Sequence, residues 1–201
     1  LSTLFTPYEF AGITLTPPTR EFEGHLDLTI GGRAVQLIEV GPAHTAGDLV
    51  VWVPDVRTCF TADVLFNGET PIMWAGPASN WIAALDTVIA LDPAVVVPGH
   101  GPVGTVDDLR VMRDYFSWVK RVATPLLEAG QSPSQAATTM LTSAEFAESP
   151  WATWDDAARL VVTLEIENRR RRGISKPLVG PARLLAFIRM GRVASALGLL
   201  P

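Results

Sequence analysis

The 201-residue sequence has few of the side chains used for redox or nucleophilic chemistry, with one cysteine and three histidines. A single cysteine excludes an internal disulfide, which is consistent with the reducing cytoplasm that we expect for this protein. No apolar run reaches the length of a membrane-spanning helix, so we expect no transmembrane segment. With 48% hydrophobic and 18% charged residues, the chain can form one sizeable core or two small ones.

Acidic side chains are missing from the C-terminal tail, although they dominate the rest of the chain. Residues 1–167 hold all 21 acidic and 8 of the 16 basic residues, and residues 168–201 hold the other 8 basic ones. A body this acidic argues against a general nucleic-acid-binding protein. We therefore expect no nucleic-acid partner, and binding of nucleic acid through the tail is the least favoured function.

The basic tail has two interpretations. In the first, it is a solvated helix end followed by a C-terminal helix that packs on the fold, because arginines suit a helix C-terminus. In the second, it contacts an anionic membrane or nucleic acid. The apolar stripe of Leu184, Leu185, Ile188 and Val193 favours packing, so membrane contact is the weaker expectation.

Several catalytic motifs are absent as well. The sequence contains no GxSxG elbow of a serine hydrolase, and Ser79 lacks flanking glycines. It also has neither a phosphate-binding P-loop nor a dinucleotide-binding glycine pattern. Cys59 lies within an apolar run, which indicates a core position rather than a nucleophile.

Hydrophobic periodicity and turn residues predict a mixed α/β fold. A hairpin is expected around Gly31-Gly32, followed by several strands and then mainly helices. The expected strands cover 13–15, 25–30, 34–40, 48–53, 58–62 and 93–98. The expected helices cover 79–92 with Ser79 as N-cap, 105–129, 133–141, 155–172 and a C-terminal segment from 180 onward.

Three potential metal ligands follow predicted strands. His44 lies in a Gly/Pro/Thr loop, Asp63 closes the run TCFTA, and His100 lies between two glycines that leave room for a metal and a substrate. Ends of strands are where α/β sheets place active sites, and two imidazoles with one carboxylate suit zinc. The alternatives are structural histidines, which we favour for His25, and a turn-capping role for Asp63.

The segments VGPAHTAGDLVVWVP, CFTADVLF and LDPAVVVPGHGPVG, in this order and spacing, resemble the metallo-β-lactamase fold hydrolases over about residues 8–130. The resemblance implies an α/β fold, the αββα sandwich, with a metal site at one edge of its two sheets. It divides the chain into a partial metallo-β-lactamase-like domain (1–130), a helical C-terminal part of that domain (131–173) and a basic amphipathic tail (174–201).

The resemblance also implies roles for the three residues. His44 matches the histidine of the third metal motif, Asp63 the catalytic carboxylate that bridges two metals, and His100 the last metal-binding histidine. The implied cofactor is one or two zinc ions, with iron or manganese as alternatives. In the family a metal-bound hydroxide attacks the substrate. For Asp48 we favour a turn and strand-start role over support of a ligand.

The family's first motif, HxHxDH, is absent from the 201 residues. We therefore expect a truncated, C-terminal part of the sandwich, with a helical extension. Its expected activity is hydrolysis of an ester, thioester, lactone or similar bond in a small-molecule substrate. The uncovered apolar face predicts a homo-oligomer or a missing N-terminal half. The alternative is a catalytically inactive half-domain with a structural or partner-binding role.

Pocket residues are harder to identify from the sequence. Trp74, Trp81, Phe66 and Asn67 are candidates to line a pocket beside the metals, with core positions as the alternative for the tryptophans.

Overall fold

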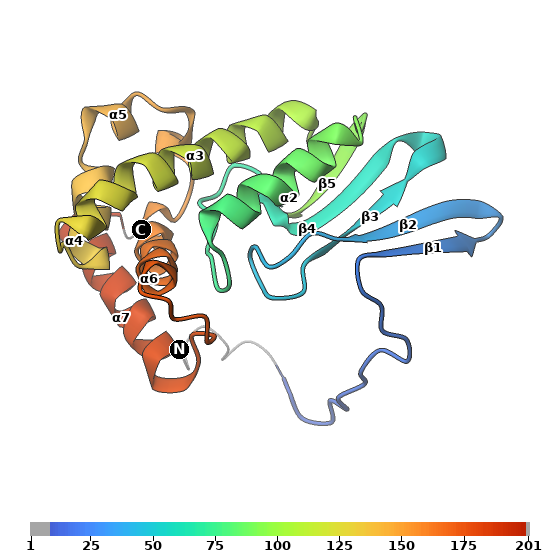
Figure 1. The fold of residues 1–201 in the computed structure, drawn as a ribbon, viewed down its shortest axis with the longest axis horizontal. Coiled ribbons are helices and arrows are strands. Elements are labelled where there is room, and N and C mark those ends of the chain that lie inside the picture. The colour runs from blue at the N-terminus through green and yellow to red at the C-terminus, as the bar shows by residue number, and fades with distance from the viewer. Residues whose placement is uncertain (1–8, 200–201) are drawn as a thin grey trace.

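A computed structural model describes residues 9–199, and its centre is a single five-stranded sheet (Figure 1). The strands lie in chain order, with antiparallel pairing from β1 to β4 and parallel pairing between β4 and β5. Their bounds are β1 His25–Ile30, β2 Arg33–Glu39, β3 Leu49–Val53, β4 Thr58–Phe66 and β5 Val95–His100.

The helices form a layer on one face of the sheet and a group beyond its end. Figure 1 shows α2 and α3 side by side over the sheet, with α4, α6 and α7 at the far end. Their bounds are α2 Ala78–Ala90, α3 Val106–Glu128, α4 Pro133–Leu141, α5 Ala144–Ala147, α6 Leu160–Arg171 and α7 Gly180–Ala196. Short 3-10 turns cover Pro54–Val56, Pro150–Thr153 and Ala157–Arg159. None of the described helices combines the length and the apolar character that a membrane span requires.

Local sequence signals explain the elements that flank the sheet. Gly31 and Gly32 have φ angles of +59° and +80°, which suit the tight turn between β1 and β2. Thr105 caps α3, where its side chain and that of Asp108 form a reciprocal capping box. Pro125 lies inside α3 without ending it. The predicted hairpin and the predicted helix start at Thr105 are both confirmed.

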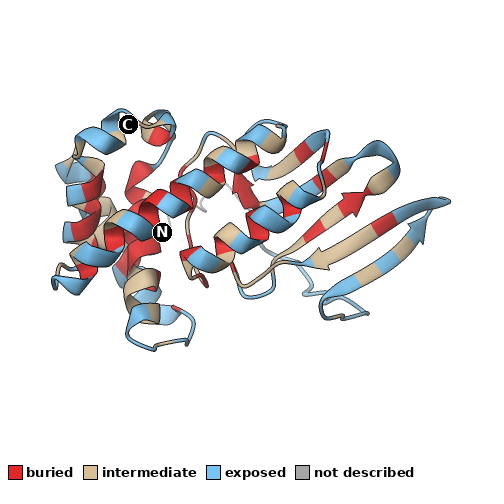
Figure 2. Cartoon of the chain, turned by 45° about the horizontal axis from the view of Figure 1, so that its top comes forward, coloured by how far each residue is buried: buried red, intermediate tan, exposed pale blue. Residues whose placement is uncertain are grey.

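The sheet is covered on one face only among the described residues. On the covered face, Trp52, Cys59 and Val96 are buried in the core cluster shared with α2 and α3. Burial raises the pKa of the Cys59 thiol to about 12, so this group is a core side chain rather than a nucleophile. In Figure 2 the buried positions gather where helices meet and on the middle strands, while the tip of the β1–β2 hairpin is exposed.

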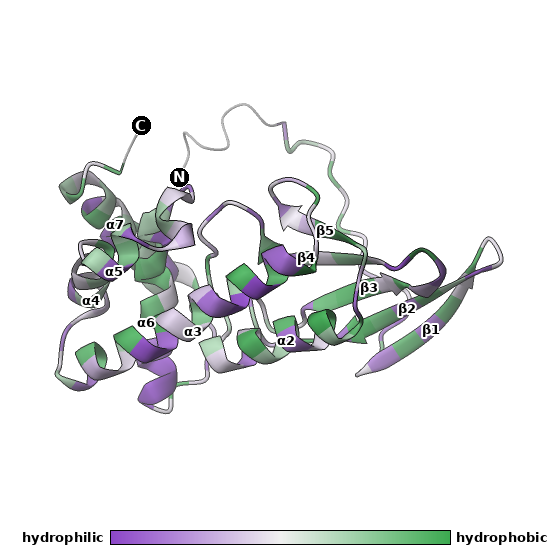
Figure 3. Cartoon of the chain, turned by 90° about the horizontal axis from the view of Figure 1, so that it is seen from above, coloured by the Kyte–Doolittle hydropathy of each residue, from purple (hydrophilic) through white to green (hydrophobic). Residues whose placement is uncertain are grey.

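The opposite face of the sheet carries an apolar row. Each of the five strands contributes one residue to this row, and that residue is paired in register with the row residue of the neighbouring strand. Figure 3 shows hydrophobic colour along β1, β2 and β3. The row consists of Leu26, Leu37, Val51, Phe60 and Val97. Phe60 is 44% exposed. A helix layer packed on one face of the sheet, followed by further helices, is the α/β arrangement that we expect.

Four predictions about individual elements were wrong. β4 continues to Phe66 instead of ending before Asp63, and no strand forms at residues 13–15. Helix α6 begins at Leu160, because a 3-10 turn at Ala157–Arg159 precedes it. Ser79 is not an N-cap either. Helix α2 begins one residue earlier, and its Ala78 amide donates to the Glu167 carboxylate from α6.

Helix α7 turns a different face inward from the one predicted. Ala186, Val193 and Ala194 are buried, and small residues let the helices approach closely. Leu184, Leu185 and Ile188 are exposed, so the predicted stripe is wrong for these three positions and right at Val193. Arg189 binds Glu165 of α6 at 2.9 Å, which shows the C-terminal helix docked on the fold.

A substitution at Glu167 tests the contact between α6 and α2. Burial raises the pKa of Glu167, so its contribution to stability is full below the ordinary glutamate pKa and is lost as the pH rises through the raised value. Glu167→Gln keeps an acceptor for the Ala78 amide without the charge. We expect the melting temperature of this variant, relative to wild type, to be higher at pH 8 than at pH 4.

The control is Glu128→Gln, at an exposed position near the end of α3. Its melting temperature should follow that of wild type at both pH values. An equal offset for Glu167→Gln at pH 4 and pH 8 would contradict the assignment.

Candidate metal-binding site

The loop that carries His44 connects β2 to β3 and is held by Asp48. The Asp48 carboxylate accepts hydrogen bonds from the Ala43 amide at 2.9 Å and from the amide and hydroxyl of Thr45. Gly41 is required here, because a Cβ atom at this position would lie 2.7 Å from the Asp48 nitrogen. The predicted turn and strand-start role of Asp48 is confirmed by these contacts.

The His44 ring is buried and oriented. Its Nδ1 lies 2.6 Å from the carbonyl oxygen of Ile72, so Nδ1 carries the proton and donates it. The ring packs between Phe66 and Trp81, at centroid distances of 5.6 and 5.9 Å. Nε2 is therefore left with its lone pair, and it lies 3.4 Å from Oδ2 of Asp63.

Asp63 lies at an irregularity within β4 rather than at the end of the strand. The register with β5 shifts on both sides of Ala62, whose φ angle is +45°. Such a bulge breaks the alternation of side chains and redirects the next residue. The Asp63 side chain is 40% exposed, and its two oxygens face different histidines, with Oδ1 3.7 Å from Nε2 of His100.

His100 ends β5, and the glycines on both sides of it are explained by close backbone contacts. A Cβ atom at Gly99 would lie 2.1 Å from Oδ1 of Asp63, and one at Gly101 would lie 1.9 Å from the Asn67 carbonyl oxygen. Phe66 stacks on the His100 ring at 4.3 Å and 8°. Because these two glycines have no side chain, β4 and β5 can bring Asp63 and His100 together. The sequence predicted that the glycines leave room for a metal and a substrate, and the structure shows that they also make room for Asp63 and the backbone of Asn67.

Two residues behind His100, Glu69 and Arg159, were not predicted from the sequence. The Nδ1 atom of His100 lies 3.6 Å from Oε2 of Glu69, and that oxygen accepts a hydrogen bond from Arg159 at 3.0 Å. Arg159 also donates to the Thr70 carbonyl. Carboxylates in this position commonly orient metal-binding imidazoles. Glu69 and Arg159 are 90 residues apart, so no local motif could have linked them.

The other candidate residues lie in different places. Trp81 is fully buried and donates to the Val64 carbonyl at 2.8 Å, so it is a core residue. Asn67 donates to the Pro102 carbonyl. His25 is on β1 and forms an ion pair with Asp27, which agrees with a structural role.

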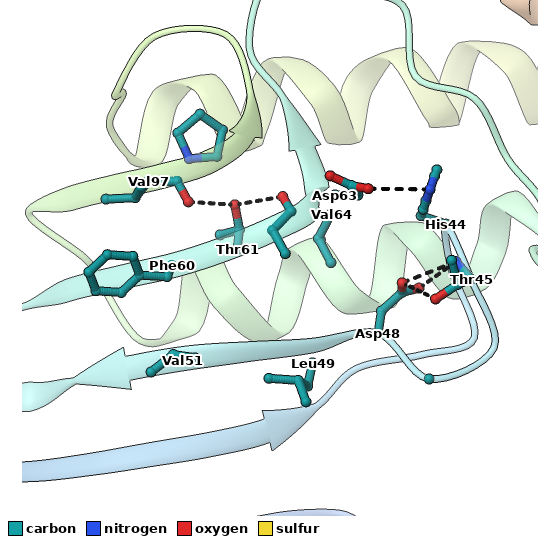
Figure 4. Close-up of a pocket in the computed structure, with 13 residues that line it drawn as sticks. His44, Thr45, Asp48, Leu49, Val51, Phe60, Thr61, Asp63, Val64 and Val97 are labelled. Atoms are coloured by element: carbon teal, nitrogen blue, oxygen red, sulfur yellow. Dashed lines mark hydrogen bonds and ion pairs between the residues drawn. The ribbon is translucent and has the colours of Figure 1, made fainter. Parts of the chain in front are cut away.

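A cavity of about 460 Å³ opens beside His44 and Asp63 (Figure 4). His44 and Asp63 form its polar end, and Leu49, Val51 and Phe60 are part of its apolar wall. Figure 4 shows the His44 ring pointing at the Asp63 carboxylate across this end. The cavity therefore places His44 and Asp63 beside Val51, Phe60 and Val97 of the apolar row, while His100 lies outside its lining.

The donor types fit a divalent metal, but their number does not complete a site. The free Nε2 atoms of His44 and His100 each face one oxygen of Asp63, which suits a carboxylate shared between two positions. Within residues 9–199 no three His, Cys, Asp or Glu side chains converge on a single point that could hold a metal. Zinc in catalytic sites takes three protein ligands and a water. Each position would need further donors.

Gly99 tests the close approach of the two strands. Gly99→Ala places a methyl group against Asp63 and backbone atoms of Ala62 and Asp63, which cannot move freely. We expect a loss of about 1–3 kcal/mol in the free energy of unfolding, measured by urea denaturation. The control is Gly191→Ala in α7, where a Cβ atom meets nothing within 4 Å. It should stabilise by up to about 1 kcal/mol. Equal stability of the two variants would refute the contact.

Comparison with known proteins gives two enzymes as relatives. The chain is 29% identical over 133 residues to a linear primary-alkylsulfatase of Pseudomonas sp. (strain ATCC 19151), covering 61% of this chain and 25% of that protein. It is 32% identical over 90 residues to the 2,4-dinitroanisole O-demethylase subunit alpha of Nocardioides sp. (strain JS1661), covering 42% of this chain and 26% of the relative. The chain thus spans about a quarter of the length of these two proteins.

A solved structure shows the same fold over most of the chain. The sec-alkylsulfatase Pisa1 from Pseudomonas sp. superposes with a TM-score of 0.61 at 17% identity, covering 78% of this chain and 27% of that one. Residues 4–100, just under half of the chain, match the metallo-beta-lactamase superfamily. This stretch contains His44, Asp63 and His100. In this part the chain is similar to the metallo-beta-lactamase superfamily.

Proposed function

We propose that the chain contributes half of a metal-dependent hydrolase site, in which His44, Asp63 and His100 are metal ligands. The observation that carries the proposal is the placement of one Asp63 carboxylate between two imidazoles whose Nε2 atoms face it. The Nδ1 of His44 is taken by a backbone carbonyl, and that of His100 faces the Glu69 carboxylate. This is how proteins prepare imidazoles to bind a metal through the other nitrogen.

The proposed cofactor is zinc, in one or two positions, because imidazole and carboxylate donors suit this ion. A bound metal would supply an activated water and positive charge for an oxyanion. The residues of this chain would hold and orient that group. Asp63 would be shared by the two positions, and Glu69, which pairs with Arg159, would help to orient the His100 ring from its Nδ1 side.

The proposed substrate is a small molecule with an ester-like bond. Support comes from the relatives, whose names describe an alkylsulfatase and the subunit of an O-demethylase. The cavity of about 460 Å³ is within the range of small-molecule sites, and its apolar wall would hold an organic group next to the ligands.

The missing donors are the reason to propose a partner for the sheet. A second β-sheet with an apolar face would cover the row from Leu26 to Val97, and its edge would meet the polar end of the cavity. We propose that such a sheet, from outside these 201 residues, brings the remaining metal ligands. The cavity in which His44 and Asp63 lie beside residues of the apolar row supports this arrangement.

A catalytically inactive half-domain is the second candidate function. The absence of a three-donor group within the described residues favours it for this chain by itself. In that case the apolar row would serve only to bind a partner. Metal binding separates the two candidates.

The first test is zinc binding to the metal-free chain, measured by competition with a chromophoric chelator. We expect measurable binding that Asp63→Asn reduces most, since Asp63 would serve both positions. His44→Ala and His100→Ala should each weaken binding by about tenfold or more, because each removes one of few ligands. His25→Ala, in an exposed strand away from the site, is the matched control.

Two results would oppose the hydrolase proposal. One is a chain that carries less than about 0.1 metal ion after zinc loading, since catalytic zinc sites are built to retain their ion. The other is zinc binding that all three site variants leave unchanged. Either result, with no hydrolysis of thioester, lactone or sulfate ester substrates, would favour the inactive half-domain.

The second test concerns the apolar row. With the row uncovered, we expect the 21.7 kDa chain to self-associate, so its mass by light scattering should exceed that of one copy. Phe60→Glu places a charge in the middle of the row and should restore the mass of a single chain. Val103→Glu, at another exposed apolar residue outside the row, should not. A monomeric wild-type chain would contradict the idea that the row requires a cover.

A further inference from the structure

A second cavity, of about 360 Å³, lies where the sheet loops meet the C-terminal helices. It shares only Thr45 with the cavity beside His44. Its lining residues come from the 42–46 loop, from Trp74 and Ala75, from the end of α6 and from the segment 175–183. The residues that matter for its chemistry are Trp74, Arg170, Leu178, Val179 and Arg183.

Charge in this cavity is of one sign. Arg170 and Arg183 line it and no aspartate or glutamate does, although the chain carries a net charge of −5. Within residues 9–199 neither arginine has a carboxylate oxygen within 4.0 Å, although Glu167 interacts with Arg170 from further away. Two arginines without close counter-charges create a site that favours an anion.

Both guanidinium groups are held in place by the protein. Arg170 donates from Nε and Nη2 to the Ala75 carbonyl at 2.9 and 2.7 Å. Arg183 lies over the Trp74 ring, with 4.0 Å from its Cζ atom to the ring centroid. A guanidinium stacked on an indole keeps its N–H edge free for paired hydrogen bonds to an oxyanion.

The rest of the wall is apolar. Leu178 is buried beneath the cavity, while Val179 is 67% exposed at its rim. Trp74 is itself packed against Phe187, with 5.4 Å between ring centroids. This surface suits an organic body rather than a bare inorganic ion, because free ions gain nothing from apolar contact.

We propose that this cavity binds a small organic anion, with its charged group on Arg183 and Arg170 and its apolar part on Trp74 and Leu178. Two residues that line this cavity, Trp74 and Ala75, are hydrogen-bonded to the backbone of His44 in the proposed metal site. The His44 carbonyl accepts hydrogen bonds from the amides of Trp74 and Ala75 at 2.9 and 3.2 Å. The site uses no metal ligand, so it stands or falls independently of the hydrolase proposal.

Isothermal titration calorimetry of the full chain tests the site with three probes. Hexanoate has both the charge and the apolar body, hexanamide has the body without the charge, and acetate has the charge without the body. We expect hexanoate to bind about tenfold or more tightly than either of the other two, since hexanamide lacks the charge that the arginines would bind and acetate lacks the apolar body. Equal binding of all three would overturn the proposal.

Variants locate the binding. Arg183→Met removes the charge at an exposed position and should weaken hexanoate binding by about tenfold or more. Arg183→Lys should weaken it less, because it keeps the charge and loses the paired N–H groups. The control is Arg192→Met on the same helix, exposed and outside the lining. Circular dichroism verifies that each variant is folded. Equal affinities for Arg183→Met and Arg192→Met would refute the assignment.

Discussion

The candidate site depends on the approach of the Asp63 carboxylate to the backbone of Gly99. The absence of a side chain at Gly99 lets β4 and β5 run close enough for one carboxylate to lie between His44 and His100. A bulge at Ala62 redirects Asp63 toward this gap. The hydrogen bond from His44 to the Ile72 carbonyl sets the ring that Asp63 meets. The donor atoms of the site are thus positioned mainly by backbone geometry.

The one-sided sheet connects this geometry to the proposed function. α2 and α3 bury one face, and the cavity on the other face brings His44 and Asp63 next to residues of the apolar row. The second sheet that we propose would cover the apolar face and would also add metal ligands at the edge that the two sheets share. The match of residues 4–100 to the metallo-beta-lactamase superfamily is consistent with this arrangement, because the resemblance implies a sandwich of two sheets.

The helical C-terminal part supports the sheet loops rather than lying apart from them. Arg159 holds Glu69 behind His100, Glu167 caps α2, and Arg170 binds the Ala75 carbonyl next to the His44 loop. Arg183 from α7 completes the second cavity over Trp74. The basic tail that the sequence left open between packing and surface contact thus contributes several of its arginines to internal contacts.

The sequence by itself determined the features that depend on neighbouring residues. It determined the glycine hairpin, the capping box at Thr105 and the loop that holds His44, because turn and cap preferences act within a few positions. His100, which the sequence placed in a loop, is the last residue of β5. Only the tertiary structure decided the rest. The continuation of β4 through Asp63, the cap of α2 by Glu167, the buried face of α7 and the pair of Glu69 with Arg159 all depend on partners far along the chain. The last two residues are 90 positions apart, and only packing of the helical part against the sheet brings such groups into contact.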